Sequence, residues 1–157
     1  MSQEQDIEKI KQELKNYERQ ITNLNDELIY LRKKLKTIQQ EISTHSNNLK
    51  KIEELINYLN NASENISEAI NDLNSFFQGN LANNISKEYT NAEEEITDIH
   101  NKIISEYNRI NDEITELKKQ QVRTEEDIED VKRQLSIYNA QLDANTRLLN
   151  NLESSNL

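Results

Sequence analysis

The sequence predicts an all-α fold, a long antiparallel helical hairpin that forms a coiled coil with a single central turn near Gly79. Three observations support this fold. The 157 residues include one Gly, no Pro and no Cys, which excludes strand-rich folds, Gly-rich nucleotide-binding folds and disulfide scaffolds. Apolar residues repeat in heptads through most of the chain. The only Gly stands almost at the midpoint, where a hairpin must turn.

The first arm of the hairpin is expected over about residues 4–77. When Ile7 is taken as heptad position a, 19 of the 21 positions a and d up to Phe77 are apolar. Only His45 and Ser63 interrupt the series, and His45 is expected to fix the register as a polar residue in the seam. A strict 3.5-residue repeat predicts a left-handed coiled coil and distinguishes the chain from a disordered one of similar polarity.

The second arm is expected over about residues 84–153, with a weaker apolar series. This series begins at Leu81 or Ala82 and places the following apolar residues in the seam: Ile85, Tyr89, Ala92, Ile96, Ile99 and Ile103. Ile99, Ile103 and Tyr107 are separated by two consecutive steps of four residues. This break in the alternation of three and four predicts a stutter. Weaker interruptions are expected at residues 43–48 and 120–124, and Thr124 with the acidic residues after it resembles a helix N-cap.

The turn is expected over about residues 78–83. Gly79 lies among Asn residues, which favour caps and turns over helix interiors. Residues 1–157 are therefore expected to form one hairpin in which residue i faces roughly residue 158 − i. One unbroken helix that dimerises in parallel is the alternative architecture.

Charge and hydropathy limit the possible partners. The net charge of −10 opposes binding to nucleic acid and to anionic membrane surfaces. No apolar stretch is long enough for membrane insertion, and the N-terminal residues lack the features of a signal peptide. We therefore expect a cytoplasmic protein, and co-export with a partner through a leaderless route stays open.

Catalysis and metal binding are not expected, because a two-helix hairpin offers almost no concave surface for an active site. We therefore predict no enzyme activity, no catalytic residue and no cofactor. His45 and His100 are expected to lie too far apart along the hairpin to bind one metal ion. The acidic run at residues 93–95 lacks the Gly-pivoted loop of calcium sites, so no metal site is predicted.

Heptad position g changes character along the first arm. It is polar in the outer part, as at Glu13 and Glu27, and apolar toward the turn. A stripe formed by positions a, d and g is wider than one helix can cover, which favours a protein partner at this end. The predicted partner-binding residues are Leu55, Ile56, Leu59, Ala62, Ile66, Ala69, Leu73 and Phe76. A structural coiled-coil spacer or a self-assembling homo-oligomer is the alternative function.

Phe77, Gln78 and Gly79 stand between two amphipathic arms and resemble the Trp-x-Gly turn of the WXG helical hairpins of bacterial type VII secretion. Phe77 occupies the place of the family's Trp. The similarity covers roughly residues 55–104 and extends to the longer helical proteins that accompany LXG-type toxins. The family's export sequence, Tyr-x-x-x-Asp/Glu, has no counterpart near the C-terminus. The resemblance implies a chaperone-like targeting factor that binds the helical N-terminal domain of a secreted toxin, or another small helical hairpin.

Overall fold

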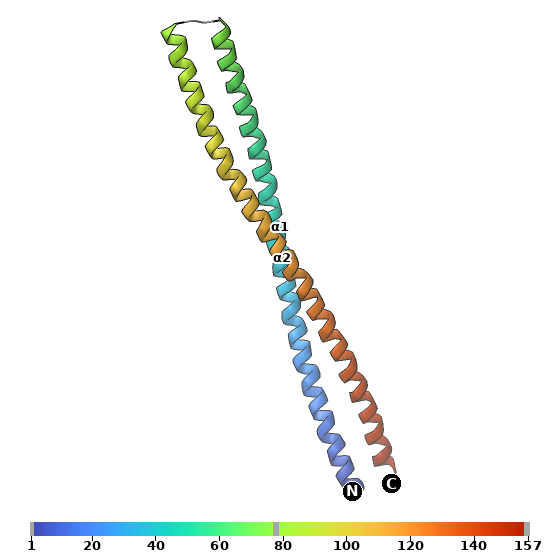
Figure 1. The fold of residues 1–157 in the computed structure, drawn as a ribbon. Coiled ribbons are helices and arrows are strands. Elements are labelled where there is room, and N and C mark those ends of the chain that lie inside the picture. The colour runs from blue at the N-terminus through green and yellow to red at the C-terminus, as the bar shows by residue number, and fades with distance from the viewer. Residues whose placement is uncertain (1, 77–78, 156–157) are drawn as a thin grey trace. The chain divides into compact units, whose positions relative to one another are not determined.

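A computed structural model describes residues 2–76 and 79–155 of the chain, apart from the side chain at position 82. This part contains two helices, α1 (Gln3–Phe76) and α2 (Asn80–Ser154). The helices run antiparallel (Figure 1), and the start of α1 lies beside the end of α2, where Gln3 Nε2 donates to the carbonyl of Leu152 at 3.2 Å. The predicted all-α antiparallel hairpin is confirmed.

Contacts between the helices follow the expected pairing of residue i with residue 158 − i. Asn145 Nδ2 donates a hydrogen bond to Glu13 at 3.0 Å, and His45 Nε2 lies 3.8 Å from a carboxylate oxygen of Glu113. In both pairs the residue numbers add up to 158. One chain therefore supplies both helices of the seam.

The start of α1 carries a reciprocal cap. The backbone N–H of Ser2 donates to the side-chain oxygen of Gln5 at 3.1 Å, and the N–H of Gln5 donates to the Ser2 hydroxyl at 3.4 Å. This capping box satisfies backbone donors that the first helical turn leaves unpaired. Glu4 and Asp6 in the first turn add negative charge at the positive end of the helix dipole.

Gly79 ends the turn with a backbone conformation that L side chains rarely adopt, at φ 113°. Its carbonyl accepts the N–H of Asn83 at 3.1 Å, which forms the first helical hydrogen bond of α2. α2 therefore begins at Asn80, four residues before the expected start at 84. Phe77 and Gln78 of the predicted turn motif lie outside the described residues.

The chain divides into two compact units, each of which contains a segment of both helices. We call Met1–Gln39 with Lys119–Leu157 the outer unit, and Gln40–Lys118 the turn unit. Each unit is described separately below.

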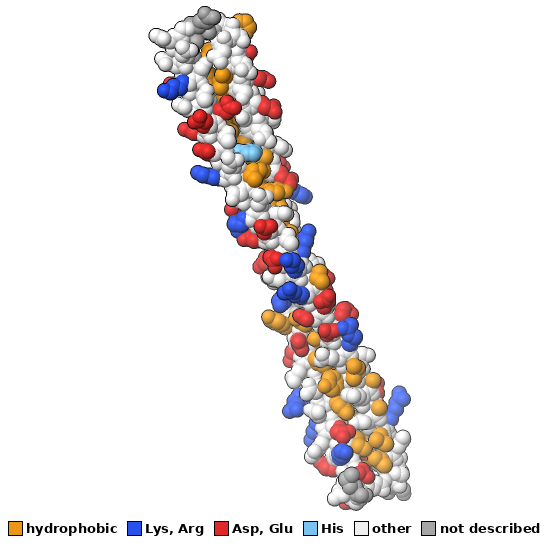
Figure 2. Space-filling view, viewed as in Figure 1, with side chains coloured by type: hydrophobic (Ala, Val, Ile, Leu, Met, Phe, Trp, Pro, Cys, Tyr) orange, Lys and Arg blue, Asp and Glu red, His pale blue; other side chains and the backbone are white. Residues whose placement is uncertain are grey.

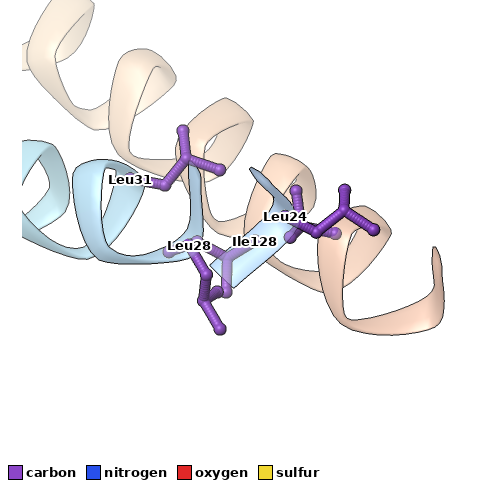
Figure 3. Packing of buried hydrophobic residues seen from close by; sticks show 5 residues of the cluster. Leu24, Leu28, Leu31 and Ile128 are labelled. Carbon is purple, nitrogen blue, oxygen red and sulfur yellow. The ribbon is translucent and has the colours of Figure 1, made fainter. Parts of the chain in front are cut away.

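The outer unit has a closed apolar seam. Leu24, Leu28 and Leu31 of α1 pack with Ile128 and Val131 of α2 (Figure 3), and all five side chains are buried. At the next layers Leu35, Leu135 and Tyr138 pack against this cluster. Each fully buried side chain of this kind contributes about 1.5–3 kcal/mol.

Thr124 does not start a new helix, so the N-cap predicted there is wrong. It lies inside α2 with 1% of its surface exposed, and its hydroxyl donates to the carbonyl of Gln120 at 2.8 Å. This bond one turn back satisfies the buried hydroxyl without ending the helix. Residues 43–48 likewise belong to continuous α1.

Candidate functional site

The seam of the turn unit passes through His100 of α2 instead of Ile99. His100 is half-buried, whereas 48% of Ile99 is exposed. The half-buried and buried positions Ile96, His100, Ile103, Tyr107 and Ile110 alternate by four and three without a break. The predicted stutter is therefore wrong, because a polar residue takes the seam position that apolar periodicity assigned to Ile99.

This register gives α2 a polar series at heptad position a in the part of the turn unit that precedes Ile114: Ser86, Glu93, His100 and Tyr107. Position d of the same helix is largely apolar, as at Ile96, Ile103 and Ile110. One of the two core series of α2 is therefore hydrophilic toward the turn.

The polar series bonds to the neighbouring helix. Ser67 Oγ of α1 donates to Glu93 at 3.1 Å, and Ser86 Oγ donates to the side-chain oxygen of Asn74 at 3.2 Å. These hydrogen bonds replace the apolar packing that an uninterrupted heptad would give, and each contributes about 0.5–1.5 kcal/mol.

Tyr107 extends this pattern, because its hydroxyl donates to the Glu53 carboxylate at 3.1 Å. The hydrogen bond and the negative charge of Glu53 both favour the neutral phenol, and they raise the pKa of Tyr107 above its ordinary value.

A cavity of about 110 Å³ lies between the helices where Ser63 interrupts the heptad of α1. Its lining consists of seam residues and their polar neighbours: Leu59, Asn60, Ser63, Ile96, Thr97 and His100. A small Ser beside His100 leaves the space that an apolar residue would fill. The space is large enough for water.

The turn unit consequently has little buried core. No described side chain from Gln40 to Arg109 is buried, and the buried residues of this unit are Ile110 and Ile114. Apolar residues at positions a and d of α1 are therefore only half covered by α2.

The predicted partner-binding residues do not share one surface. Ile56, Leu59, Ala62, Ile66, Ala69 and Leu73 are half-buried, whereas Leu55 and Phe76 are exposed. Ile56, Ile66 and Leu73 occupy core positions a or d, and Leu55, Ala62 and Ala69 occupy position g beside the core.

Residues of α2 complete the position-g surface, and sequence reasoning missed them. Ile85, Ala92 and Ile99 each stand one residue before a member of the polar series at position a. They therefore occupy position g of α2. Placing His100 in the seam instead of its neighbour Ile99 would have moved Ile85, Ala92 and Ile99 to position g. Apolar periodicity favoured Ile99 as the seam residue.

The two sides of the seam differ in chemistry. In an antiparallel pair, positions g of both helices border one side and positions e border the other; we call these sides the g flank and the e flank. The His45 and Glu113 contact lies on the g flank, at positions d and g. Toward the turn, the e flank of the turn unit carries polar residues of both helices: Glu53, Asn60, Ser67, Asn74, Asn83, Thr90 and Thr97. Ile104 is an apolar exception farther along α2.

Acidic side chains in the turn unit are mostly dispersed on helix surfaces. Within residues 2–76 and 79–155, no group of three or more His, Asp or Glu residues is arranged to hold a metal ion. Arg109 pairs with Glu106 and Glu113 along α2, and its hydrogen bond lowers the pKa of Glu106. In the described part of the chain, neither helix is long and apolar enough to cross a membrane.

Comparisons with protein-family models, with curated proteins and with solved structures find no match for this chain.

Proposed function

We propose that this chain is a non-enzymatic protein-binding hairpin that binds a helical partner through the turn unit. One observation carries the proposal: the turn unit combines an apolar series on α1 with no buried side chain among the described residues from Gln40 to Arg109. Helices of a partner would cover this surface and form a bundle. Each large apolar side chain buried there would contribute about 1.5–3 kcal/mol before the entropy of association is subtracted.

The resemblance of Phe77, Gln78 and Gly79 to the WXG turn suggests the class of partner. On this proposal the chain is a chaperone-like targeting factor for an LXG-type toxin of a type VII secretion system, and it binds the toxin's helical N-terminal domain. It acts in the cytoplasm, either released before export or exported with the toxin.

A structural spacer or self-assembling homo-oligomer is the second candidate. The closed core of the outer unit favours it, because the cluster from Leu24 to Val131 is complete without a partner. A spacer requires no uncovered apolar surface in the turn unit, which is why we place it second.

Photo-cross-linking tests the proposal. A benzophenone amino acid replaces Ala62 in the turn unit or, as the control, Ile29 in the outer unit, in cells that produce the protein. We expect a covalent adduct with a second helical protein at position 62 and none at position 29, identified by mass spectrometry. Leu59→Asp with Phe76→Asp is expected to abolish the adduct, while circular dichroism shows that the helices persist.

Two results would contradict the proposal. Adducts formed only between copies of this chain would favour self-assembly, and light scattering would then show a concentration-independent oligomer. Equal adducts at positions 62 and 29 would remove the turn unit as a specific binding region.

A further inference from the structure

We infer that the g flank of the turn unit is the docking surface, and that its occupant is a basic amphipathic helix of the partner protein. This inference rests on the proposed function and specifies the surface and the chemistry of the partner.

The g flank of the turn unit is apolar on both helices only in the part nearer the turn. Position g is polar farther from the turn, at Glu41, Asn48, Glu106 and Glu113. The apolar strip consists of three aliphatic or small residues from each helix: Leu55, Ala62, Ala69, Ile85, Ala92 and Ile99. Leu55 is 45% exposed and Ile99 is 48% exposed. Two helices therefore present an apolar strip whose larger side chains lie at its ends, with Leu55 and Ile99 at one end and Ile85 at the other.

Elsewhere the flanking positions are mainly polar, with Leu148 of the outer unit and Ile104 on the e flank as apolar exceptions. In the outer unit, position g carries charged residues such as Glu13, Glu27 and Asp127. On the e flank of the turn unit, hydrogen bonds such as that from Ser67 to Glu93 occupy polar side chains. A strip that is apolar on one side of one unit is typical of a helix-docking groove.

The charge of the chain is concentrated around the same strip. Residues 52–101 contain ten acidic residues and one basic residue, Lys87, whereas the rest of the chain contains 19 acidic and 18 basic residues. The turn end therefore carries a net charge of −9 out of the total of −10. On the face that Figure 2 shows, red acidic side chains predominate over blue basic ones near the turn.

Acidic residues also border the strip directly. Position c follows position g around a helix, away from the seam, and it is occupied by Asp72 on α1 and by Glu88 and Glu95 on α2. All three side chains are exposed. Lys51 and Lys102 occupy the same position beside Leu55 and Ile99, so the negative charge borders the strip on its turn-proximal part.

This charge pattern selects the occupant. A second copy docked by the same strip would bring two segments of net charge −9 together, and like charges at an interface disfavour association. A helix with an apolar stripe between rows of Lys and Arg would instead bury the strip and pair with Asp72, Glu88 and Glu95.

Two synthetic helices test this inference with the full chain. Both peptides have four heptads with the same Leu stripe, and they carry either Lys or Glu at the positions beside it. We expect the Lys peptide to bind about tenfold more tightly than the Glu peptide in fluorescence anisotropy at low salt. We also expect the preference to shrink as salt is added.

Matched variants locate the site. Leu55→Gln with Ile99→Gln is expected to weaken binding of the Lys peptide about tenfold or more. The control, Ile29→Gln with Ile137→Gln, changes residues of similar exposure in the outer unit and should leave binding unchanged.

The charge variants are matched in the same way. Asp72→Asn with Glu88→Gln and Glu95→Gln should weaken binding of the Lys peptide about fivefold, because each exposed pair contributes modestly. Glu64→Gln with Glu68→Gln and Asp98→Asn makes the same change in net charge at heptad positions b and f, away from the strip. That control should have less than about half of the effect.

Equal binding of the two peptides would overturn the inference, as would equal effects of the two charge variants. So would a concentration-independent dimer of the chain that requires Leu55 and Ile99. If cross-linking at position 62 finds a partner but the g-flank variants bind normally, the proposed function holds and the inference fails. If cross-linking finds no partner, the proposed function itself fails.

Discussion

The outer unit and the turn unit share the same heptad pattern on α1 but differ in how completely α2 covers it. In the outer unit, position a of α2 carries mainly aliphatic residues: Ile128, Leu135, Leu142 and Leu149. In the turn unit the same position carries Ser86, Glu93, His100 and Tyr107 before it becomes aliphatic at Ile114. Among the described residues, a cluster of buried side chains from both helices is found in the outer unit. A regular repeat on one helix therefore does not close a seam unless the facing helix supplies apolar residues at the matching layers.

The two units also differ in how far their acidic residues are neutralised by basic ones. In the outer unit, Lys132 lies 2.7 Å from Glu129, and Arg133 pairs with Asp130 one turn away on α2. The hydrogen bond from Lys132 lowers the pKa of Glu129. Basic residues of this kind are nearly absent from residues 52–101. The outer unit thus neutralises its own charge, whereas the turn end retains a negative charge that a partner can neutralise.

The largest expected difference between the units comes from one substitution made in each. Leu24 and Leu59 both occupy position d of α1, but Leu24 is buried and Leu59 is half-buried. Leu24→Ala should lower the free energy of unfolding by about 3 kcal/mol, and Leu59→Ala by about 1 kcal/mol. Urea unfolding followed by circular dichroism measures both values. Equal losses would show that the two units are equally closed in solution.

Apolar substitutions in the polar series of α2 should make the turn unit more like the outer unit. Glu93→Leu with His100→Leu places apolar side chains in the open seam, and we expect the turn unit to gain about 1–2 kcal/mol after the hydrogen bond from Ser67 is lost. Amide hydrogen exchange of residues 52–101, read by mass spectrometry, should slow about tenfold.

The control for this prediction is Glu68→Leu with Asp98→Leu, which adds Leu at exposed positions outside the seam. It should leave exchange of the same amides unchanged. Equal protection in the control would mean that added apolarity or reduced charge, and not the polar seam, determines how open the turn unit is.

The sequence predicted the hairpin and its pairing because these depend on composition, on the heptads of α1 and on the single Gly. It did not predict the seam of α2, because Ile99 and His100 are neighbours and periodicity favours the apolar one. The predicted stutter resulted from placing Ile99 in the seam. Which neighbour enters the seam depends on the register set by the whole of α2, where Ile103, Ile110 and Ile128 fix the alternation.

The candidate site was predicted only in part for the same reason. Leu55, Ala62 and Ala69 were recognised as an apolar position-g series on the first arm. Their counterparts on α2, Ile85 and Ile99, were assigned to the core and so were not recognised as a surface. A single helix cannot reveal that two apolar strips meet on one flank, because that requires the register between the helices.

A smaller effect is expected from the turn, and it should be confined to the turn unit. Gly79 has φ 113°, and a Cβ added there would meet no atom within 4 Å. Gly79→Ala should therefore lower stability by about 1 kcal/mol through backbone strain alone. Hydrogen exchange should accelerate near the turn and remain unchanged around Leu24 and Val131. Asn80→Ala is the control, because it keeps Gly79 and should cost less. Faster exchange in both units would show that the units open together.

The smallest expected effect is a pH dependence of the turn unit at alkaline pH. The hydrogen bond from Tyr107 to Glu53 raises the pKa of Tyr107 above its ordinary value of 10.0. A raised pKa in the folded state contributes stability that is complete below the ordinary pKa and is lost as the pH rises through the raised value. The neutral phenol donates to Glu53, whereas the phenolate repels it.

Absorbance at alkaline pH, compared between the chain and Tyr107→Phe, should therefore isolate one phenol that titrates above pH 10, in the direction set by Glu53. Glu53→Gln should lower the pKa of that phenol, because it removes the negative charge. Tyr58→Phe, which removes a phenol that is 72% exposed, is the control. A Tyr107 phenol that titrates at its ordinary pKa would mean that the e flank of the turn unit lacks this contact in solution. The remaining hydrogen bonds between the helices at the polar series would then be those donated by Ser67 and Ser86.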